Sequence, residues 1–449
     1  MELRDIIVTP VVLMLIYIAA YFFRPMFTDA VTRTYFIPAL TLRIIGALAV
    51  GFIYQFYYDG GDTYNYHTHG SRHVWEAFME SPATGIKLLF ADGQSHEGIY
   101  KYSSRIPFFT EWTSYNVVRV AAVFDLFTFS TYSATALLFA VLSFLGVWML
   151  FRTFYEQYPH LHRGLAIACL FVPSVVFWGS GLLKDTLALT FLCFSTYLTY
   201  RIFIRRRGNW ISAILLLFCL YALYSVKAYI LLNFLPAAIF WVFIKRLSFI
   251  RSTVAKVTLF PFVIVAALGL GFYAVNKASE DNPKYSLNRL AQTAQITAYD
   301  IRYYTGKDAG SGYTLGELDG TYGSIVRLAP QAINVSLFRP WPWEVKNLFM
   351  LLSSLESLAL LLVVIFVVLR HHRYLLKYLR NPDVLFALIF SISFAFAVGV
   401  STFNFGTLVR YKIPLMPFFS MTLILLHDFC LRDEGRLSLA KRASGDLLS

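Results

Sequence analysis

Side chains able to perform acid–base or phosphate chemistry gather in four short segments of an otherwise apolar sequence. The first segment, YYDGGDTYNYHTHGSRH at 57–73, places Asp59 and Asp62 on either side of two glycines and ahead of a run of Tyr and His. A carboxylate beside a bound hydroxyl group can serve as a general base. We therefore predict Asp62 as the catalytic residue, and Asp59, Tyr66 and His67 as substrate-binding residues.

Two other interpretations of this segment stay open. The glycines can simply end a helix, with Tyr and His forming the aromatic belt of a membrane interface. Alternatively, His67, His69 and His73 are weak candidate ligands for a metal, because imidazole is a common ligand of divalent cations. A divalent cation is thus the one cofactor that the sequence suggests.

The second segment, FVPSVVFWGSGLLKDT at 171–186, ends in Lys184 and Asp185, and Lys227 follows later in LYSVKAYI. Lys227 lies between two apolar runs with almost no connecting loop. We predict that all three residues bind substrate, because lysine at a membrane surface can hold a lipid phosphate. The alternative is a Lys184–Asp185 pair that extends to the interface without any ligand, and Lys227 can extend its charged end to the interface in the same way.

The third and fourth segments add further cations. SLFRPWPWEVKN at 336–347 places Arg339 and Glu344 around two tryptophans and two prolines, and STFNFGTLVRYKIPLMPFF at 401–419 contains Arg410 and Lys412. A rigid aromatic platform with one Arg and one Glu is suited to sugars and phosphates. We predict that these four residues bind substrate, since clustered cations form strong charge-assisted hydrogen bonds to a diphosphate.

The elements that must position these segments are membrane helices. Of the 449 residues 57% are apolar and only 14% are charged, whereas soluble proteins are about a quarter charged. Apolar runs of near-spanning length predict an all-α integral membrane protein with about eleven transmembrane helices. The net charge of +13 does not indicate nucleic acid, because most of the excess lies in short loops between apolar runs.

The distribution of charge predicts which connections face the cytoplasm. Five short connections together hold sixteen Lys or Arg residues and only Asp29 and Glu156 as acids. The two long connections are not basic: 58–118 has four basic and seven acidic residues, and 276–346 has eight and seven. By the positive-inside rule the long connections are extracytoplasmic loops, and all four chemical segments fall on their side.

These assignments predict one polytopic membrane domain over 1–430 and a cytoplasmic tail over 431–449. The stretch 117–131 is either a further span or an interfacial helix, and Arg119 and Asp125 favour the interfacial helix.

The motifs GGDTYNYH, PSVVFWGSGLLKD, FRPWPWE and NFGTLVRYKIPLMPF together resemble a group of bacterial membrane proteins of envelope-polysaccharide loci. More distantly, the chain is similar to the GT-C class of membrane glycosyltransferases and to O-antigen polymerase-like proteins. The resemblance implies a multi-pass protein of the bacterial inner membrane, a polyprenyl-phosphate or diphosphate sugar as donor, and Asp62 as the base. GT-C enzymes use a DE or DxD sequence, whereas here GlyGly separates Asp59 from Asp62.

We therefore expect a glycosyltransferase that joins sugars on the outer face of the membrane. One alternative is a repeat-unit polymerase that needs no carboxylate base, and another is a transporter or flippase of lipid-linked saccharides. A transporter should show repeated halves and charges at the middle of the bilayer. A non-catalytic scaffold of an export complex is the third alternative.

Overall fold

The computed structural model describes residues 3–94, 96–247, 296, 311–316 and 322–445. Every named element among them is a helix, and Gly312 and Asn404 form an isolated β-bridge. Eight of these helices are long and apolar enough to cross a membrane. The protein is therefore an all-α multi-pass membrane protein.

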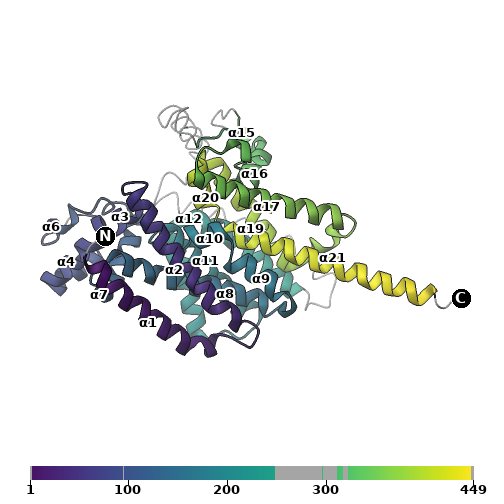
Figure 1. The fold of residues 1–449 in the computed structure, drawn as a ribbon, viewed down its shortest axis with the longest axis horizontal. Coiled ribbons are helices and arrows are strands. Elements are labelled where there is room, and N and C mark those ends of the chain that lie inside the picture. The colour runs from purple at the N-terminus through teal and green to yellow at the C-terminus, as the bar shows by residue number, and fades with distance from the viewer. Residues whose placement is uncertain (1–2, 95, 248–295, 297–310, 317–321, 446–449) are drawn as a thin grey trace. The chain divides into compact units, whose positions relative to one another are not determined.

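The chain divides into two compact units, residues 1–231 and 232–449. The spanning helices that begin in unit 1 are α1 (Leu3–Phe27), α2 (Arg33–Phe56), α8 (Tyr132–Tyr155), α11 (Lys184–Thr199) with its extension η3 (Tyr200–Ile204), and α12 (Trp210–Leu247), which continues into unit 2 (Figure 1). Those of unit 2 are α17 (Leu348–His371), α19 (Pro382–Thr402) and α21 (Leu415–Gly445).

Four predicted spans, 164–178, 211–226, 229–244 and 257–275, do not correspond to one described helix each. The 38-residue α12 has non-helical backbone angles at Lys227, so it comprises two helical segments that match the predicted spans 211–226 and 229–244. The predicted span 164–178 is two short helices, α9 (His162–Leu170) and α10 (Pro173–Trp178), because Pro173 cannot continue α9. The predicted span 257–275 lies outside the described residues, so the count of eleven stays a prediction.

Helix α8 is the centre of unit 1. It packs against α11, α2 and α1, and most of its membrane-spanning part is buried. A Cβ added at Gly146 of α8 would lie 2.9 Å from Cα of Thr190 on α11, so only glycine allows these two backbones to approach. By contrast, Ile16 is the single buried residue of α1, which therefore exposes most of its apolar surface.

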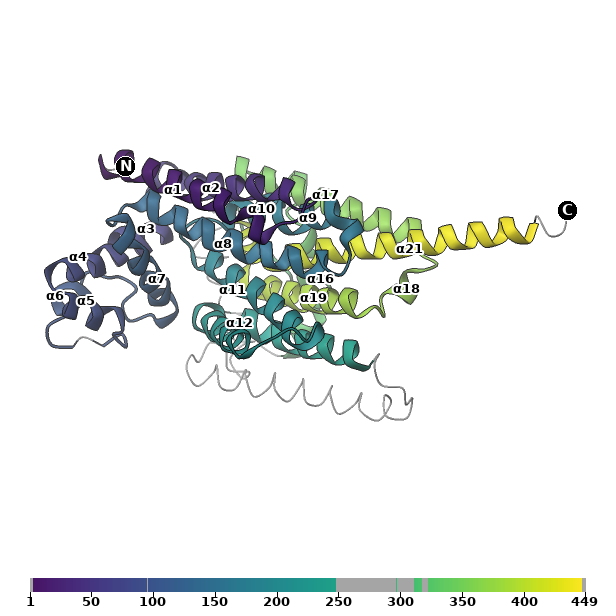
Figure 2. The ribbon, with the colours of Figure 1, turned by 90° about the horizontal axis from the view of Figure 1, so that it is seen from below.

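Short helices form a cap at one end of unit 1, which Figure 2 shows beyond the ends of α1, α2 and α8. We call these elements the α3–α7 cap: α3 (Asp62–Tyr66), the π-helical turn η1 (His67–Ser71), α4 (Arg72–Glu80), α5 (Pro82–Leu89), α6 (Tyr100–Ser103) and α7 (Trp112–Thr128). They occupy most of the predicted extracytoplasmic loop 58–118. Helix α7 covers the ambiguous stretch 117–131 and is not one of the eight candidate spans.

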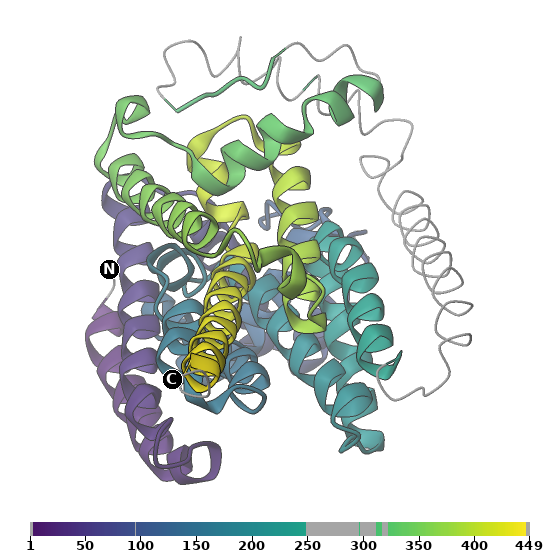
Figure 3. The ribbon, with the colours of Figure 1, turned by 90° about the vertical axis from the view of Figure 1, so that its right-hand side faces the viewer.

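Unit 2 is built on α19, which packs against α21 and against α16 (Ala329–Phe338), as Figure 3 shows for the green and yellow helices. A Cβ at Gly399 would lie 2.2 Å from the carbonyl oxygen of Ala332, so α16 rests directly on the α19 backbone. The elements that complete this unit are α15 (Tyr322–Arg327), η5 (Pro342–Glu344), α18 (Leu375–Tyr378) and α20 (Phe405–Tyr411). Helix α21 continues through the predicted tail as far as Gly445.

Contacts within each unit join connections that the charge distribution assigns to the same side. In unit 1, the Tyr35 hydroxyl lies 2.8 Å from Nδ1 of His162, between two predicted cytoplasmic connections. In unit 2, the bridge between Gly312 and Asn404 joins two predicted outer segments. These contacts agree with the predicted topology, while the sidedness itself stays a prediction.

Candidate functional site

The candidate base Asp62 begins α3 directly after a turn with unusual backbone angles. Asp59, Gly60 and Gly61 have φ values of 51°, 116° and 115°. Two successive glycines allow this left-handed conformation at little steric cost, which explains why α2 ends and α3 starts within a few residues. Asp59 is exposed, and Asp62 is half-buried at the first position of α3.

His67 lies in a buried polar network and not on a surface that a ligand could reach. Its Nε2 is 3.3 Å from Oδ1 of Asp125 in α7, and both side chains have no exposed surface. Ser71 and Thr135 each donate to the Asp125 carboxylate at 2.6 Å. The π-helical turn η1 therefore directs His67 and Ser71 toward one buried carboxylate, which ties α3 and α4 to α7. Tyr66 is buried as well.

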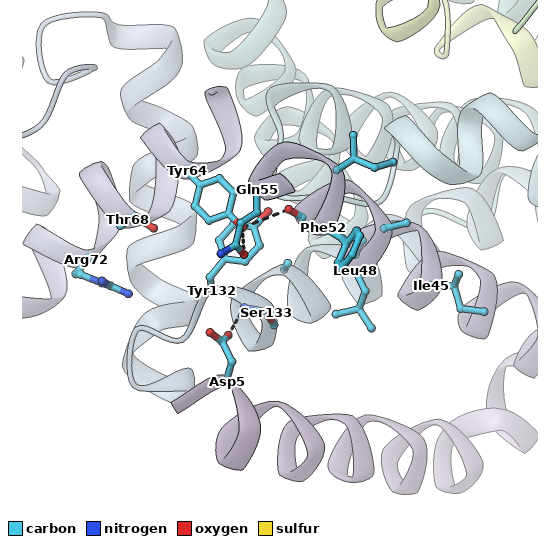
Figure 4. A pocket seen from close by; sticks show the side chains of 15 residues that line it. Asp5, Ile45, Leu48, Phe52, Gln55, Tyr64, Thr68, Arg72, Tyr132 and Ser133 are labelled. Atoms are coloured by element: carbon cyan, nitrogen blue, oxygen red, sulfur yellow. Dashed lines mark hydrogen bonds between the residues drawn. The ribbon is translucent and has the colours of Figure 1, made fainter. Parts of the chain in front are cut away.

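A cavity of about 500 Å³ lies where α3, η1 and α4 meet α1, α2 and α8 (Figure 4). Its polar lining includes Asp5, Gln55, Tyr64, Thr68 and Arg72. The last three are four residues apart, so they follow one face of the helical segment that begins at Asp62. The apolar lining comes mainly from α2, namely Ile45, Leu48 and Phe52.

The acid that lines this cavity is Asp5 and not Asp62. An Asp5 oxygen accepts a hydrogen bond of 3.2 Å from the backbone N–H of Ser133 (Figure 4). The Tyr64 hydroxyl donates to the side chain of Gln55 at 3.1 Å, and the Tyr64 ring stacks on Tyr132 with centroids 4.5 Å apart. Asp5 was not predicted as a site residue, because its partner Ser133 is 128 positions away in the sequence.

Lys184 and Asp185 do not pair with each other, although they are neighbours in sequence. The ammonium of Lys227 lies 2.5 Å from an Asp185 oxygen, and both side chains are buried. Lys184 contacts Glu111 at 3.2 Å and Thr113 at 2.9 Å. Burial raises the pKa of Glu111, but Lys184 and the nearby hydroxyls outweigh burial and hold that pKa below its ordinary value. Both predicted lysine ligands of unit 1 thus have carboxylate partners.

Arg43, inside the spanning helix α2, was missed by the sequence interpretation. It is fully buried, and its guanidinium donates to the carbonyls of Val175 and Gly179 at 2.8 and 3.0 Å and contacts the Ser143 hydroxyl at 3.2 Å. The carbonyl of Val175 also accepts from the backbone N–H of Gly179, and that of Gly179 accepts from the Ser143 hydroxyl, so Arg43 adds a charged donor to the two carbonyls at the end of α10. An arginine within an apolar run is itself a signal for such a role.

In unit 2 the aromatic platform of 336–347 is held together by Arg339 and Glu344. Two guanidinium nitrogens of Arg339 bind Glu344, with Nε 3.0 Å from one carboxylate oxygen, and the backbone N–H of Trp341 donates to the same carboxylate at 2.8 Å. Trp341 and Trp343 stack with centroids 5.6 Å apart. Although burial raises the pKa of Glu344, the hydrogen bonds from Arg339 and Trp341 hold it below its ordinary value.

The platform contacts the fourth chemical segment through aromatic rings. The Arg339 guanidinium lies 5.3 Å from the centre of the Phe405 ring and 5.8 Å from that of Tyr313. Tyr313 in turn contacts Thr402 at 2.6 Å through its hydroxyl. The predicted residues Arg339 and Glu344 therefore lie beside the segment that contains Arg410, which is half-buried in α20.

Lys412 is the most unusual charged residue of unit 2. It is fully buried, and its Nζ donates to the hydroxyl of Ser357 on α17 at 3.0 Å. Among the described residues no carboxylate forms an ion pair with it, and Ser353 and Ser354, on the same face of α17, have hydroxyls without a hydrogen-bond partner. We call Lys412 with Ser353, Ser354 and Ser357 the lysine–serine cluster.

Burial also lowers the pKa of Lys412, the titratable residue of this cluster. Lys412 precedes the spanning part of α21, which begins at Leu415. Removal from water lowers the pKa of Lys412 to about 8, against the weaker attraction of Glu356. A buried ammonium bound to one hydroxyl, with two further unpaired hydroxyls on the same helix, is an arrangement that an anion would stabilise, because the anion supplies an opposite charge.

The three histidines that were weak metal candidates do not face a common site. His67 faces Asp125, His73 lies 3.0 Å from Glu76 on its own helix, and His69 is exposed. Within the part of the chain that the structure describes, no three His, Cys, Asp or Glu side chains are grouped to hold a metal ion.

Comparisons with known proteins give no further guide to this site. No protein-family model matches the chain, and neither a curated protein nor a solved structure is found to match it. The functional argument therefore depends on the described residues alone.

Proposed function

We propose that this protein is a bacterial inner-membrane enzyme that transfers saccharide from a polyprenyl-linked phosphate or diphosphate donor in envelope-polysaccharide synthesis. The observation that supports the proposal most strongly is the lysine–serine cluster. A buried lysine that forms no ion pair with a carboxylate among the described residues, and is attracted only weakly by Glu356, is unfavourable unless something else compensates its charge, and residues of this kind near a membrane are commonly functional.

The chemistry of the donor fits this cluster. A sugar leaves a polyprenyl diphosphate when the bond between its anomeric carbon and the phosphate oxygen breaks, so negative charge develops on the diphosphate. Lys412 would stabilise that charge, and the hydroxyls of Ser353 and Ser354 would donate hydrogen bonds to the phosphate oxygens, whereas Ser357 already donates to the carbonyl of Arg339. Arg339 and Arg410 belong to neighbouring segments of the same unit, and Arg339 is paired with Glu344.

The proposal covers both enzymatic hypotheses from the sequence. A glycosyltransferase of the GT-C type would use Asp62 as the base, whereas a repeat-unit polymerase would depend on the cations alone. The cluster supports either one, because both release the same diphosphate. The base role of Asp62 stays a prediction from sequence resemblance.

Binding of a short isoprenyl diphosphate tests the proposal directly. Purified full-length protein in nanodiscs is titrated with geranylgeranyl diphosphate, and the same titration is done with geranylgeraniol. We expect the diphosphate to bind at least about tenfold more tightly than the alcohol, and Lys412→Met to remove this preference, because one charge-assisted hydrogen bond contributes about 1.5–3 kcal/mol. Lys346→Met, at an exposed lysine, is the matched control. Equal binding of the diphosphate by wild type and Lys412→Met would contradict the proposal.

A further inference from the structure

The cavity between α1, α2 and α3 belongs to unit 1, and nothing in the proposed function uses it. Its volume of about 500 Å³ is within the usual range for small-molecule sites. Its chemistry differs from that of the lysine–serine cluster, because its lining includes a carboxylate beside a guanidinium, whereas the cluster has one lysine and no carboxylate. A multiply charged anion is therefore a poor match for this cavity.

The polar end of the cavity is suited to hydroxyl groups. Gln55 accepts a hydrogen bond from Tyr64 through its oxygen, and its amide nitrogen, which can donate twice, makes no hydrogen bond to a described residue. Thr68 adds a hydroxyl from the next turn, and Figure 4 shows both side chains beside the tyrosine pair. Neutral donors and acceptors next to aromatic rings match the hydrogen-bonding capacity and apolar faces of a sugar ring.

The other end of the cavity is apolar and faces the lipid. Ile45, Leu48 and Phe52 line the cavity and are also exposed on the outer surface of α2. Helix α1 bounds the cavity opposite α2, and Ile16 is its single buried residue. A molecule with a hydrocarbon chain can therefore enter from the bilayer between α1 and α2 without crossing a polar barrier.

We propose that this cavity binds a glycolipid, with the sugar against Gln55, Tyr64 and Thr68 and the hydrocarbon chain along α2. The neutral hydrogen-bonding groups of Gln55, Tyr64 and Thr68 and the apolar wall formed by α2 together support the proposal. This proposal does not depend on the lysine–serine cluster, which lies in the other unit. Either the glycolipid site or the diphosphate site can be refuted without affecting the other.

Photo-crosslinking tests the proposal. The probe is an alkyl β-glucoside with a diazirine in its chain, added to full-length protein in nanodiscs, and the labelled peptides are identified by mass spectrometry. We expect labelling within 45–55, competed by dodecyl glucoside but not by dodecanol or free glucose. Equal competition by dodecanol would overturn the sugar site, and better competition by lysophosphatidylethanolamine would assign the cavity to a phospholipid head group instead.

Helix α2 offers a matched pair of variants, one inside the cavity and one outside it. Leu42 and Leu48 are 36% and 38% exposed on α2, but only Leu48 lines the cavity. We expect Leu48→Trp to reduce labelling about tenfold by filling the cavity, and Leu42→Trp to leave it unchanged. Equal labelling of the two variants would refute the cavity as the binding site. Gln55→Leu provides a second test that does not depend on filling: it should abolish the preference for dodecyl glucoside over dodecanol, and an unchanged preference would overturn the predicted sugar contacts.

Discussion

Replacing Lys412 with methionine should stabilise the folded protein at neutral pH while removing diphosphate binding. The pKa of Lys412 falls from an ordinary 10.5 to about 8 on burial. At about 1.4 kcal/mol for each pH unit, this difference corresponds to a cost of roughly 3 kcal/mol for the buried charge. Loss of the hydrogen bond to Ser357 offsets about 1 kcal/mol. The net gain expected for Lys412→Met is therefore about 2 kcal/mol.

The pH dependence follows from the direction of this shift. A lysine whose pKa is lower in the folded state binds its proton less readily there than in the unfolded state. The cost to wild type is thus complete below about pH 8, shrinks between pH 8 and 10.5, and disappears above 10.5, where both states hold neutral lysine. The advantage of Lys412→Met should shrink over the same interval.

Thermal unfolding followed by tryptophan fluorescence measures this effect. A gain of about 2 kcal/mol should raise Tm by roughly 4–8 °C at pH 7 for a unit of this size, and by clearly less at pH 10. Lys346→Met, which removes an exposed lysine, should change Tm little at either pH. A lower Tm for Lys412→Met at pH 7, or a difference that does not depend on pH, would refute the idea that Lys412 is an uncompensated buried charge.

Three further predictions concern unit 1. Lys227→Met should destabilise the protein by about 3–5 kcal/mol because it leaves Asp185 buried without its charged partner, and Lys227→Met combined with Asp185→Leu should recover most of that loss in Tm; no recovery would show that the pair is not the cause. Arg43→Met should lower Tm more than Arg43→Lys, since lysine can still donate to the α10 carbonyls, and equal losses would argue against this role. If Asp62 is the base, Asp62→Asn should slow transfer by about 10²–10⁴-fold in a single-turnover assay while Asp59→Asn has a smaller effect; a normal rate for Asp62→Asn would favour the polymerase-like mechanism.

The spanning helices were predictable because hydropathy is a local property of the sequence. Helices α1, α2 and α8 coincide closely with apolar runs of about twenty residues, and sequence alone also located the interruption at Lys227. The break between α9 and α10 was not predicted, although Pro173 was a signal for it. The role of Arg43 at the other end of α10 was not predicted either, because its partners Val175 and Gly179 are about 130 positions away in the sequence and pairing at that distance leaves no local pattern.

The candidate site was predicted in its residue types but not in their partners. Lys184 and Asp185 are adjacent in sequence, yet a helix directs neighbouring side chains apart, so each finds its partner on another segment. Arg339 and Glu344, five positions apart, do pair, because η5 turns the chain back between them. Ser357 escaped notice because serine in an apolar helix is common, and only the packing of α17 shows that its hydroxyl binds a buried ammonium.

Turnover of a defined lipid-linked donor is the most direct test of the central claim. Purified protein in nanodiscs is supplied with a radiolabelled polyprenyl diphosphate-linked saccharide, and release of polyprenyl diphosphate together with lengthening of the saccharide is followed. We expect wild type and Lys346→Met to release both products in equal amounts, and Lys412→Met to release neither at a measurable rate while staying folded. Full activity of Lys412→Met, or a wild-type protein that moves the donor across the membrane without breaking the sugar–phosphate bond, would contradict the proposed function.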